Sequence, residues 1–186
     1  RNGWLDRIPA YATRVVQDDV SKNYTAQFWE PQHFEWHDAE FDRAEVGSLL
    51  IYEAHVGMSQ EEPKVGTYKE FTKKVLPRIK KAGYNAVQLM AIAEHPYYGS
   101  FGYHVSNFFA PSSRFGTPEE LKRLIDTAHG MGIAVIMDLV HAHYVKNWNE
   151  GLRDLDGSDH HYSKPGNAGY QKYWDSMVFD YGKGGV

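Results

Sequence analysis

Three apolar runs alternate with two amphipathic segments along the second part of the chain. The runs cover residues 49–56, 86–90 and 133–140, and each is continuous enough to predict a strand that is buried on both faces. The segments between them repeat their apolar residues at helical spacing. The order β-α-β-α-β predicts parallel strands joined by right-handed crossovers.

The first predicted helix begins with a capping box, Thr67-x-x-Glu70. In this motif the threonine and the glutamate each satisfy a backbone N–H group of the other. Pro77 is expected to kink the helix, because proline has no N–H to donate and its ring crowds the preceding turn. Gly83 is expected to end it.

The second predicted helix carries clearer signals. Its capping box is Thr117-Pro-x-Glu120, with the proline at the first helical position. Gly130 or Gly132 closes the helix. Its apolar stripe consists of Leu121, Leu124, Ile125 and Ala128.

The N-terminal part of the chain has a different character. Residues 15–16 and 24–29 resemble short strands, and the acidic stretch 35–45 is typical of a linker. We therefore expect two parts: residues 1–46, the end of an N-terminal β-type module with its linker, and residues 47–186, an α/β domain.

The connections after the second and third strands are long. Residues 91–116 follow the second strand, and nothing clearly helical follows the third up to the end of the chain. In a parallel α/β protein such connections lie at the carboxyl ends of the strands, where active sites are built. A doubly wound sheet and a TIM barrel both begin this way. The absence of a glycine-rich phosphate loop disfavours the dinucleotide-binding versions.

Composition narrows the class of partner. The formal net charge is −4, and Lys and Arg are spread along the chain, which disfavours a nucleic-acid or anionic-membrane partner. No apolar run approaches the ~20 residues of a membrane span. The chain has no cysteine, which fits a reducing, cytoplasmic compartment. Aromatic residues make up 15% of the chain, and such rings can bind sugars.

The loop over residues 94–114 is the first candidate for chemistry. Its Tyr and Phe rings can stack on the apolar face of a pyranose, while its His and Asn side chains can hydrogen-bond sugar hydroxyls. The alternative is an aromatic mini-core that braces a long loop.

The second candidate is the cluster at the end of the third strand. Asp138, His141 and His143 place a carboxylate and two imidazoles beside the functional face. The simplest alternative is that Asp138 and His141 hydrogen-bond local backbone. Since side chains two apart on a strand share a face, His141 and His143 also allow a metal site, as in a barrel-type metal hydrolase.

Several stretches form a specific pattern when taken together: Ile51–Gly57, Tyr84–Met90, Glu94–Pro96, Phe101–Val105, Phe109–Pro118, Asp138–His143 and Trp174–Ser176 with Phe179. In these stretches the chain resembles the α-amylase superfamily, and within it the glycogen and starch branching enzymes of the plant and animal type. The similarity runs nearly end to end, from Arg7–Ala10 and Phe28–Pro31 onward.

The resemblance implies an α/β fold that is the beginning of a (β/α)8 TIM barrel, with about the first three strands and two helices in this chain. It also implies a retaining double displacement in glycogen biosynthesis. One carboxylate attacks an α-1,4 linkage, an acid protonates the leaving oxygen, and a 6-hydroxyl of another glucan captures the segment.

The resemblance implies roles for individual residues in binding an α-1,4-glucan. Tyr103 resembles the tyrosine that stacks under the sugar at the cleavage point. His143 resembles the histidine that hydrogen-bonds that sugar, and Asp138 resembles the aspartate that supports it. The donor groove and its ring platforms are completed by Glu94, His95, Tyr98 and Trp174.

Two departures from the family pattern matter. Ala142 stands where many amylases have a calcium-binding asparagine, so we expect no structural calcium there, and no cofactor is implied. The nucleophile, the acid/base and the stabiliser are implied to follow Val186, so we expect this chain alone to be inactive. A noncatalytic glucan-binding fragment and the metal hydrolase remain as alternatives.

Overall fold

The computed structural model describes residues 4–186, which form two compact units. The first, here called the loop unit, contains the residues up to Trp29 together with 93–110 and 139–186. The second, here called the sheet unit, contains residues 30–92 and 111–138. Across residues 4–186, no helix is both long and apolar enough to cross a membrane.

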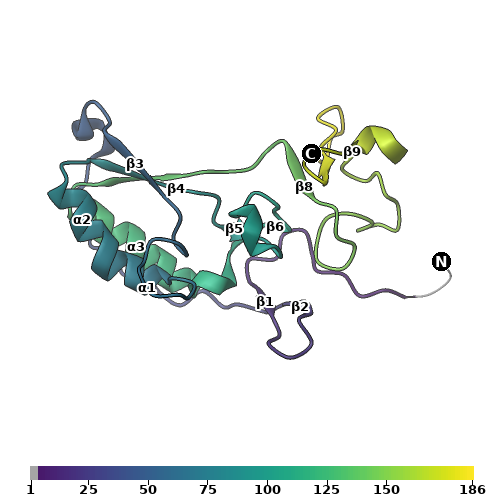
Figure 1. Ribbon diagram of the computed structural model, residues 1–186, viewed down its shortest axis with the longest axis horizontal. Helices are drawn as coiled ribbons and strands as arrows, with labels where there is room; N and C mark the ends of the chain where they lie inside the picture. Colours follow the sequence, from purple (N-terminus) through teal and green to yellow (C-terminus); the bar gives the residue numbers. More distant parts are fainter. Residues whose placement is uncertain (1–3) are drawn as a thin grey trace. The chain divides into compact units, whose positions relative to one another are not determined.

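The sheet unit is built on a three-stranded parallel sheet. Its strands are β3 (Ile51–Ala54), β4 (Ala86–Leu89) and β7 (Ala134–Met137), and β4 lies between the other two. Figure 1 shows the helices of this unit together on one side of the strands. They are α1 (Tyr68–Glu70), α2 (Leu76–Lys81) and α3 (Pro118–Gly130). The predicted β-α-β-α-β order with parallel strands is confirmed.

Helix α3 begins and ends where the sequence predicts. The backbone N–H of Glu120 donates to Thr117 Oγ1 at 3.3 Å, and the N–H of Thr117 donates to Glu120 Oε2 at 3.2 Å. Both halves of the capping box are therefore formed. The helix ends at Gly130, and Gly132 follows with a left-handed φ of 68°.

The disturbance expected at Pro77 takes the form of a π-helical turn. The capping box at Thr67 opens α1, a π-helical segment covers Phe71–Val75, and α2 follows with Pro77 in its first turn. Pro77 has no N–H to donate to the preceding turn, and the wider π-helical turn accommodates its ring. Gly83, with φ of 88°, follows the end of α2 as predicted.

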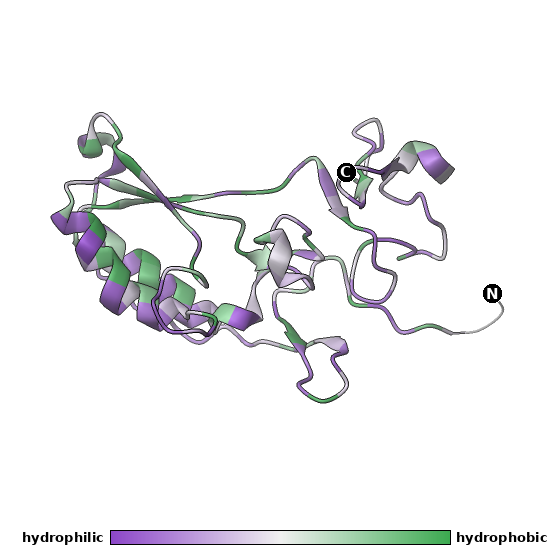
Figure 2. Ribbon diagram, viewed as in Figure 1, coloured by the Kyte–Doolittle hydropathy of each residue, from purple (hydrophilic) through white to green (hydrophobic). Residues whose placement is uncertain are grey.

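The expectation that all three strands are buried on both faces is wrong for the outer two. Val87 and Leu89 in β4 are fully buried, whereas Leu50 beside β3 is 60% exposed and Met137 in β7 is 42% exposed. Of the described strands in this sheet, only β4 has a neighbour on each side, and the helices cover one face. Green in the ribbon of Figure 2 marks the hydrophobic residues of these strands. Apolar side chains of the outer strands therefore contact solvent in the described chain.

The loop unit contains short antiparallel strands. The two predicted N-terminal strands are confirmed as a pair, β1 (Val15–Gln17) and β2 (Tyr24–Ala26). A second sheet has the order β8-β10-β9, with bounds His143–Val145, Ser176–Val178 and Tyr170–Gln171.

The segment 91–116 is more ordered than the predicted loop, because β5 (Ala93–Glu94) and β6 (Asn107–Pro111) pair within it. Two small apolar clusters support the loop unit. One is centred on Ile8, Val15 and Ala110. The other is centred on Tyr144, Leu152 and Met177 and lies beside the strand that begins with His143. The second cluster therefore supports the strand that carries His143.

Candidate functional site

His143, the first residue of β8, is held by two segments that are distant in sequence. Its Nε2 lies 2.9 Å from the backbone carbonyl oxygen of Tyr103, and since a carbonyl can only accept, Nε2 carries the proton. Its ring centroid lies 5.2 Å from that of Trp174, with the planes inclined by 42°. The other nitrogen, Nδ1, is buried and has no hydrogen-bond partner among residues 4–186.

The surroundings of His143 favour its neutral form. Burial lowers the pKa of the imidazole below its ordinary 6.5, and the charge of His104 lowers it further, while the Tyr103 carbonyl partly opposes both. At neutral pH the ring is therefore uncharged, with Nδ1 as an acceptor. An uncharged imidazole beside an aromatic ring suits an uncharged sugar better than an anion.

Trp174 presents a large exposed ring next to this histidine. Trp174 is 54% exposed, and its backbone carbonyl accepts a hydrogen bond from His104 Nε2 at 2.8 Å. The indole thus combines contact with the His143 ring and exposure to solvent. An exposed ring of this kind, backed by a second ring, is a suitable stacking platform for a pyranose.

Tyr98 and Tyr103 belong to one tight turn. Tyr98 opens a 3-10 turn that ends at Ser100, and Phe101 and Gly102 follow with left-handed φ values of 56° and 94°. This reversal lets the Tyr103 N–H donate to the Ser100 carbonyl at 3.0 Å. The turn thereby brings the Tyr103 carbonyl to His143.

Glu94 and His95 lie inside the loop unit rather than at its surface. Glu94 is 1% exposed and His95 is 0% exposed. The His95 N–H donates to Glu94 Oε1 at 3.1 Å, and its ring Nδ1 donates to the Ala93 carbonyl at 2.9 Å. Ser106 donates to the Glu94 carbonyl through both its N–H and its hydroxyl. These contacts fix the strand that precedes the Tyr98 turn.

Asp138 belongs to the sheet unit, directly after the end of β7. Its N–H donates to the carbonyl of Leu89, the last residue of β4, at 3.1 Å. It therefore lies at the carboxyl edge of the parallel sheet, as the sequence predicts.

The geometry behind the metal-site alternative is not formed. The third strand ends at Met137 instead of continuing to Val140, and His143 begins a different strand, so His141 and His143 do not share a face of one strand. The reason is a bend at Ala142, where the chain has left the parallel sheet. Within residues 4–186 no group of three His, Cys, Asp or Glu side chains could hold a metal ion.

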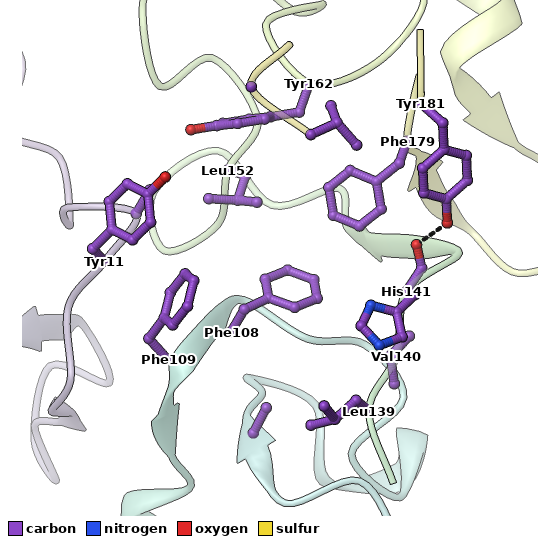
Figure 3. Close-up of a pocket in the computed structure, with 14 residues that line it drawn as sticks. Tyr11, Phe108, Phe109, Leu139, Val140, His141, Leu152, Tyr162, Phe179 and Tyr181 are labelled. Carbon is purple, nitrogen blue, oxygen red and sulfur yellow. Dashed lines mark hydrogen bonds between the residues drawn. The ribbon is translucent and has the colours of Figure 1, made fainter. Parts of the chain in front are cut away.

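A separate cavity of about 450 Å³ lies in the loop unit (Figure 3). Its wall includes the rings of Tyr11, Phe108, Phe109, Tyr162, Phe179 and Tyr181. The Tyr181 hydroxyl donates to the His141 carbonyl at its edge. None of the seven predicted site residues, all within the described range, lines this cavity. The cluster around His143 and Trp174 is therefore the candidate site that contains the predicted residues.

Residue patterns did not single out His104, although it follows Tyr103 directly. In the structure its ring lies 6.4 Å from those of both Tyr97 and His143, and it bonds the Trp174 backbone. The only signal in the sequence was its place in a loop rich in Tyr and His.

A family model described as "Alpha amylase, catalytic domain" matches residues 24–174. Two similar relatives are 1,4-alpha-glucan-branching enzymes. The one from Yarrowia lipolytica is 56% identical over 185 residues, which cover 97% of this chain and 26% of the relative. The one from Saccharomyces cerevisiae is 56% identical over 188 residues, which cover 95% of this chain and 27% of the relative. The chain thus spans about a quarter of the length of these relatives.

Solved structures resemble the chain as well. A putative alpha amylase from Salmonella typhimurium superposes with a TM-score of 0.62 and 25% identity, over 83% of this chain and 24% of that protein. The GBS pullulanase SAP, solved in complex with maltotetraose, superposes with a TM-score of 0.66 over 91% of this chain and 27% of that protein. Its identity is 21%, so it supports the fold alone. The fold is of the TIM-barrel type of α/β protein.

Proposed function

Since the chain belongs to the alpha-amylase family, we propose that the protein that carries it is a 1,4-α-glucan branching enzyme. The observation that carries the proposal is the 56% identity, over 97% of this chain, to the Yarrowia lipolytica enzyme of that name. The reaction cleaves an α-1,4-glucan and transfers the segment to a 6-hydroxyl of another glucan. It serves glycogen biosynthesis, and we expect it in the cytoplasm.

The proposal assigns residues 47–186 to the first three strands and two helices of the barrel. Residues 1–46 form the end of an N-terminal module and its linker. The pairing of β3, β4 and β7 in sequence order supports this reading, because consecutive parallel strands with helices on the outer face begin such a barrel. The three catalytic acids are placed outside this sequence.

The cluster around His143 binds the donor glucan in this proposal. The neutral ring of His143 contacts a sugar hydroxyl, as the resemblance implies. Tyr103 and Trp174 supply stacking surfaces, with Tyr98 in the same turn as Tyr103. Asp138 keeps the supporting role that the resemblance implies for it.

Glu94 and His95 act indirectly. Because both are almost fully buried, they hold the Tyr98 turn in place rather than touch the sugar. Ala142 offers no side-chain oxygen, so no calcium is expected at that position.

Branching is tested on the complete protein that contains this sequence, with amylose as the only substrate. The expected result is a rise in α-1,6 branch points, counted by enzymatic debranching, with little increase in reducing ends. An increase in reducing ends without branch points would show a hydrolase and overturn the proposal.

The isolated 186-residue chain separates catalysis from binding. We expect it to leave amylose unbranched but to bind maltoheptaose saturably, because the proposed acids lie elsewhere whereas the His143 and Trp174 rings are present. Branch points made by this chain alone would refute the placement of the acids.

A further inference from the structure

His104 connects two segments of the loop unit that are far apart in sequence. Its Nε2–H donates to the carbonyl of Trp174 at 2.8 Å, across a separation of 70 residues. A side-chain donor to a backbone carbonyl fixes the position of the chain at that point, and so fixes the direction in which the attached side chain leaves it.

The same turn is anchored on its other side by the residue that follows Trp174. The Asp175 carboxylate accepts hydrogen bonds from Lys146 Nζ at 2.6 Å and from the hydroxyl of Tyr170. Asp175 also has a left-handed φ of 50°, which reverses the chain directly after Trp174. The indole is thus presented from a turn that is held at the Trp174 carbonyl and at the Asp175 side chain.

The ring of His104 lies among the groups of the candidate site. It approaches His143 edge-on, with ring centroids 6.4 Å apart and planes at 88°. The ring centroid of His143 in turn lies 5.2 Å from that of the Trp174 indole. A shift of the Trp174 backbone away from His104 would therefore separate the two rings that form the platform.

We propose that His104 is a positioning residue that sets the Trp174 indole against His143 and thereby sets the affinity of this site for α-1,4-glucan. The proposal rests on the proposed function for its ligand, but not for its geometry. His104 acts through the backbone of Trp174. Any side chain that can donate an N–H to the Trp174 carbonyl from the same place should therefore preserve the position of the indole.

Glucan affinity is measured by calorimetry with maltoheptaose on the complete protein. We expect His104→Ala to weaken binding about three- to tenfold, the size of one lost hydrogen bond. His104→Gln keeps an amide N–H donor at similar reach and should stay within about twofold of the unaltered protein. His160→Ala, which removes an exposed imidazole elsewhere in the loop unit, is the matched control and should bind unchanged.

A double variant tests whether the effect passes through the indole. In a Trp174→Ala background, His104→Ala should cause no further loss of affinity. The same loss with and without Trp174, an unchanged affinity of His104→Ala, or a failure of His104→Gln to restore binding would each overturn the proposal.

A spectroscopic readout keeps the test independent of glucan. With 5-fluorotryptophan in the protein, the resonance of Trp174 is assigned by its loss in Trp174→Phe. It should shift in His104→Ala and stay in place in His104→Gln, and an unmoved resonance in both overturns the positioning role. Absence of any maltoheptaose binding by the unaltered protein would instead refute the glucan part of the proposal.

Discussion

Tyr144 and Ser163 meet inside the loop unit, where their hydroxyl oxygens lie 2.6 Å apart. Both residues are almost completely buried. Tyr144 directly follows His143 in β8, and Ser163 pairs with Phe179 through an isolated bridge. The hydrogen bond therefore ties the segment around residue 163 to the strand that carries the candidate site.

Removing either hydroxyl leaves the other buried without its partner. Tyr144→Phe should lower the free energy of unfolding by about 1–3 kcal/mol, the usual cost of an unsatisfied buried polar group. Ser163→Ala should cost a similar amount. In the double variant neither hydroxyl remains, so its cost should be smaller than the sum of the single costs by roughly 1 kcal/mol.

Thermal unfolding followed by circular dichroism measures these changes. For a chain of this size each kcal/mol lowers the Tm by roughly 2–4 °C. Tyr173→Phe, which removes a hydroxyl from a residue that is 91% exposed, is the matched control and should leave the Tm unchanged. Strictly additive single and double variants, or a Tyr144→Phe Tm equal to that of the control, would refute the buried bond.

Two pH-dependent predictions follow from local contacts. Hydrogen bonds, the largest contribution coming from the Ser158 N–H, lower the pKa of Asp156 from 3.8 to about 2. The ionised Asp156 carboxylate therefore stabilises the fold fully above pH 3.8, and this stabilisation is lost as the pH falls toward 2. Carboxyl NMR should report that pKa, and Ser158→Ala, which removes the hydroxyl donor, should raise it; equal values near 3.8 in both proteins would contradict the contacts. Burial lowers the pKa of His143 below 6.5, so on acidification the unfolded chain takes up this proton before the folded chain does. The contribution of the neutral ring to stability is therefore complete above pH 6.5 and decreases as the pH falls below it. Maltoheptaose affinity should likewise be constant from pH 8 to 6.5 and decline at lower pH, and a decline that persists in His143→Gln would assign it to another group.

Much of the sheet unit could be predicted because its signals are local. The capping boxes at Thr67 and Thr117 involve residues three positions apart, and both are formed. Gly83 and Gly132 adopt left-handed φ values near the helix ends, as glycine allows without steric cost. The order of strands and helices followed from the alternation of continuous apolar runs with segments of helical periodicity.

The burial of the strands could not be predicted in the same way. An apolar run has the same sequence pattern in an edge strand as in a central strand. Only the order of the strands in the sheet shows that β4 has a neighbour on each side. The same limit applies to Glu94 and His95. The resemblance implied that they shape a donor groove, and it gave no sign that hydrogen bonds to neighbouring backbone allow them to be buried.

The sequence by itself therefore determined the helices, their ends, the order of helices and strands along the chain, and the family resemblance. The tertiary structure alone decided that His104 bonds the backbone of Trp174 and that the rings of His143 and Trp174 are in contact. The reason is physical: a cap depends on neighbours within one turn of the chain. A contact across 70 residues depends on every turn and strand between them.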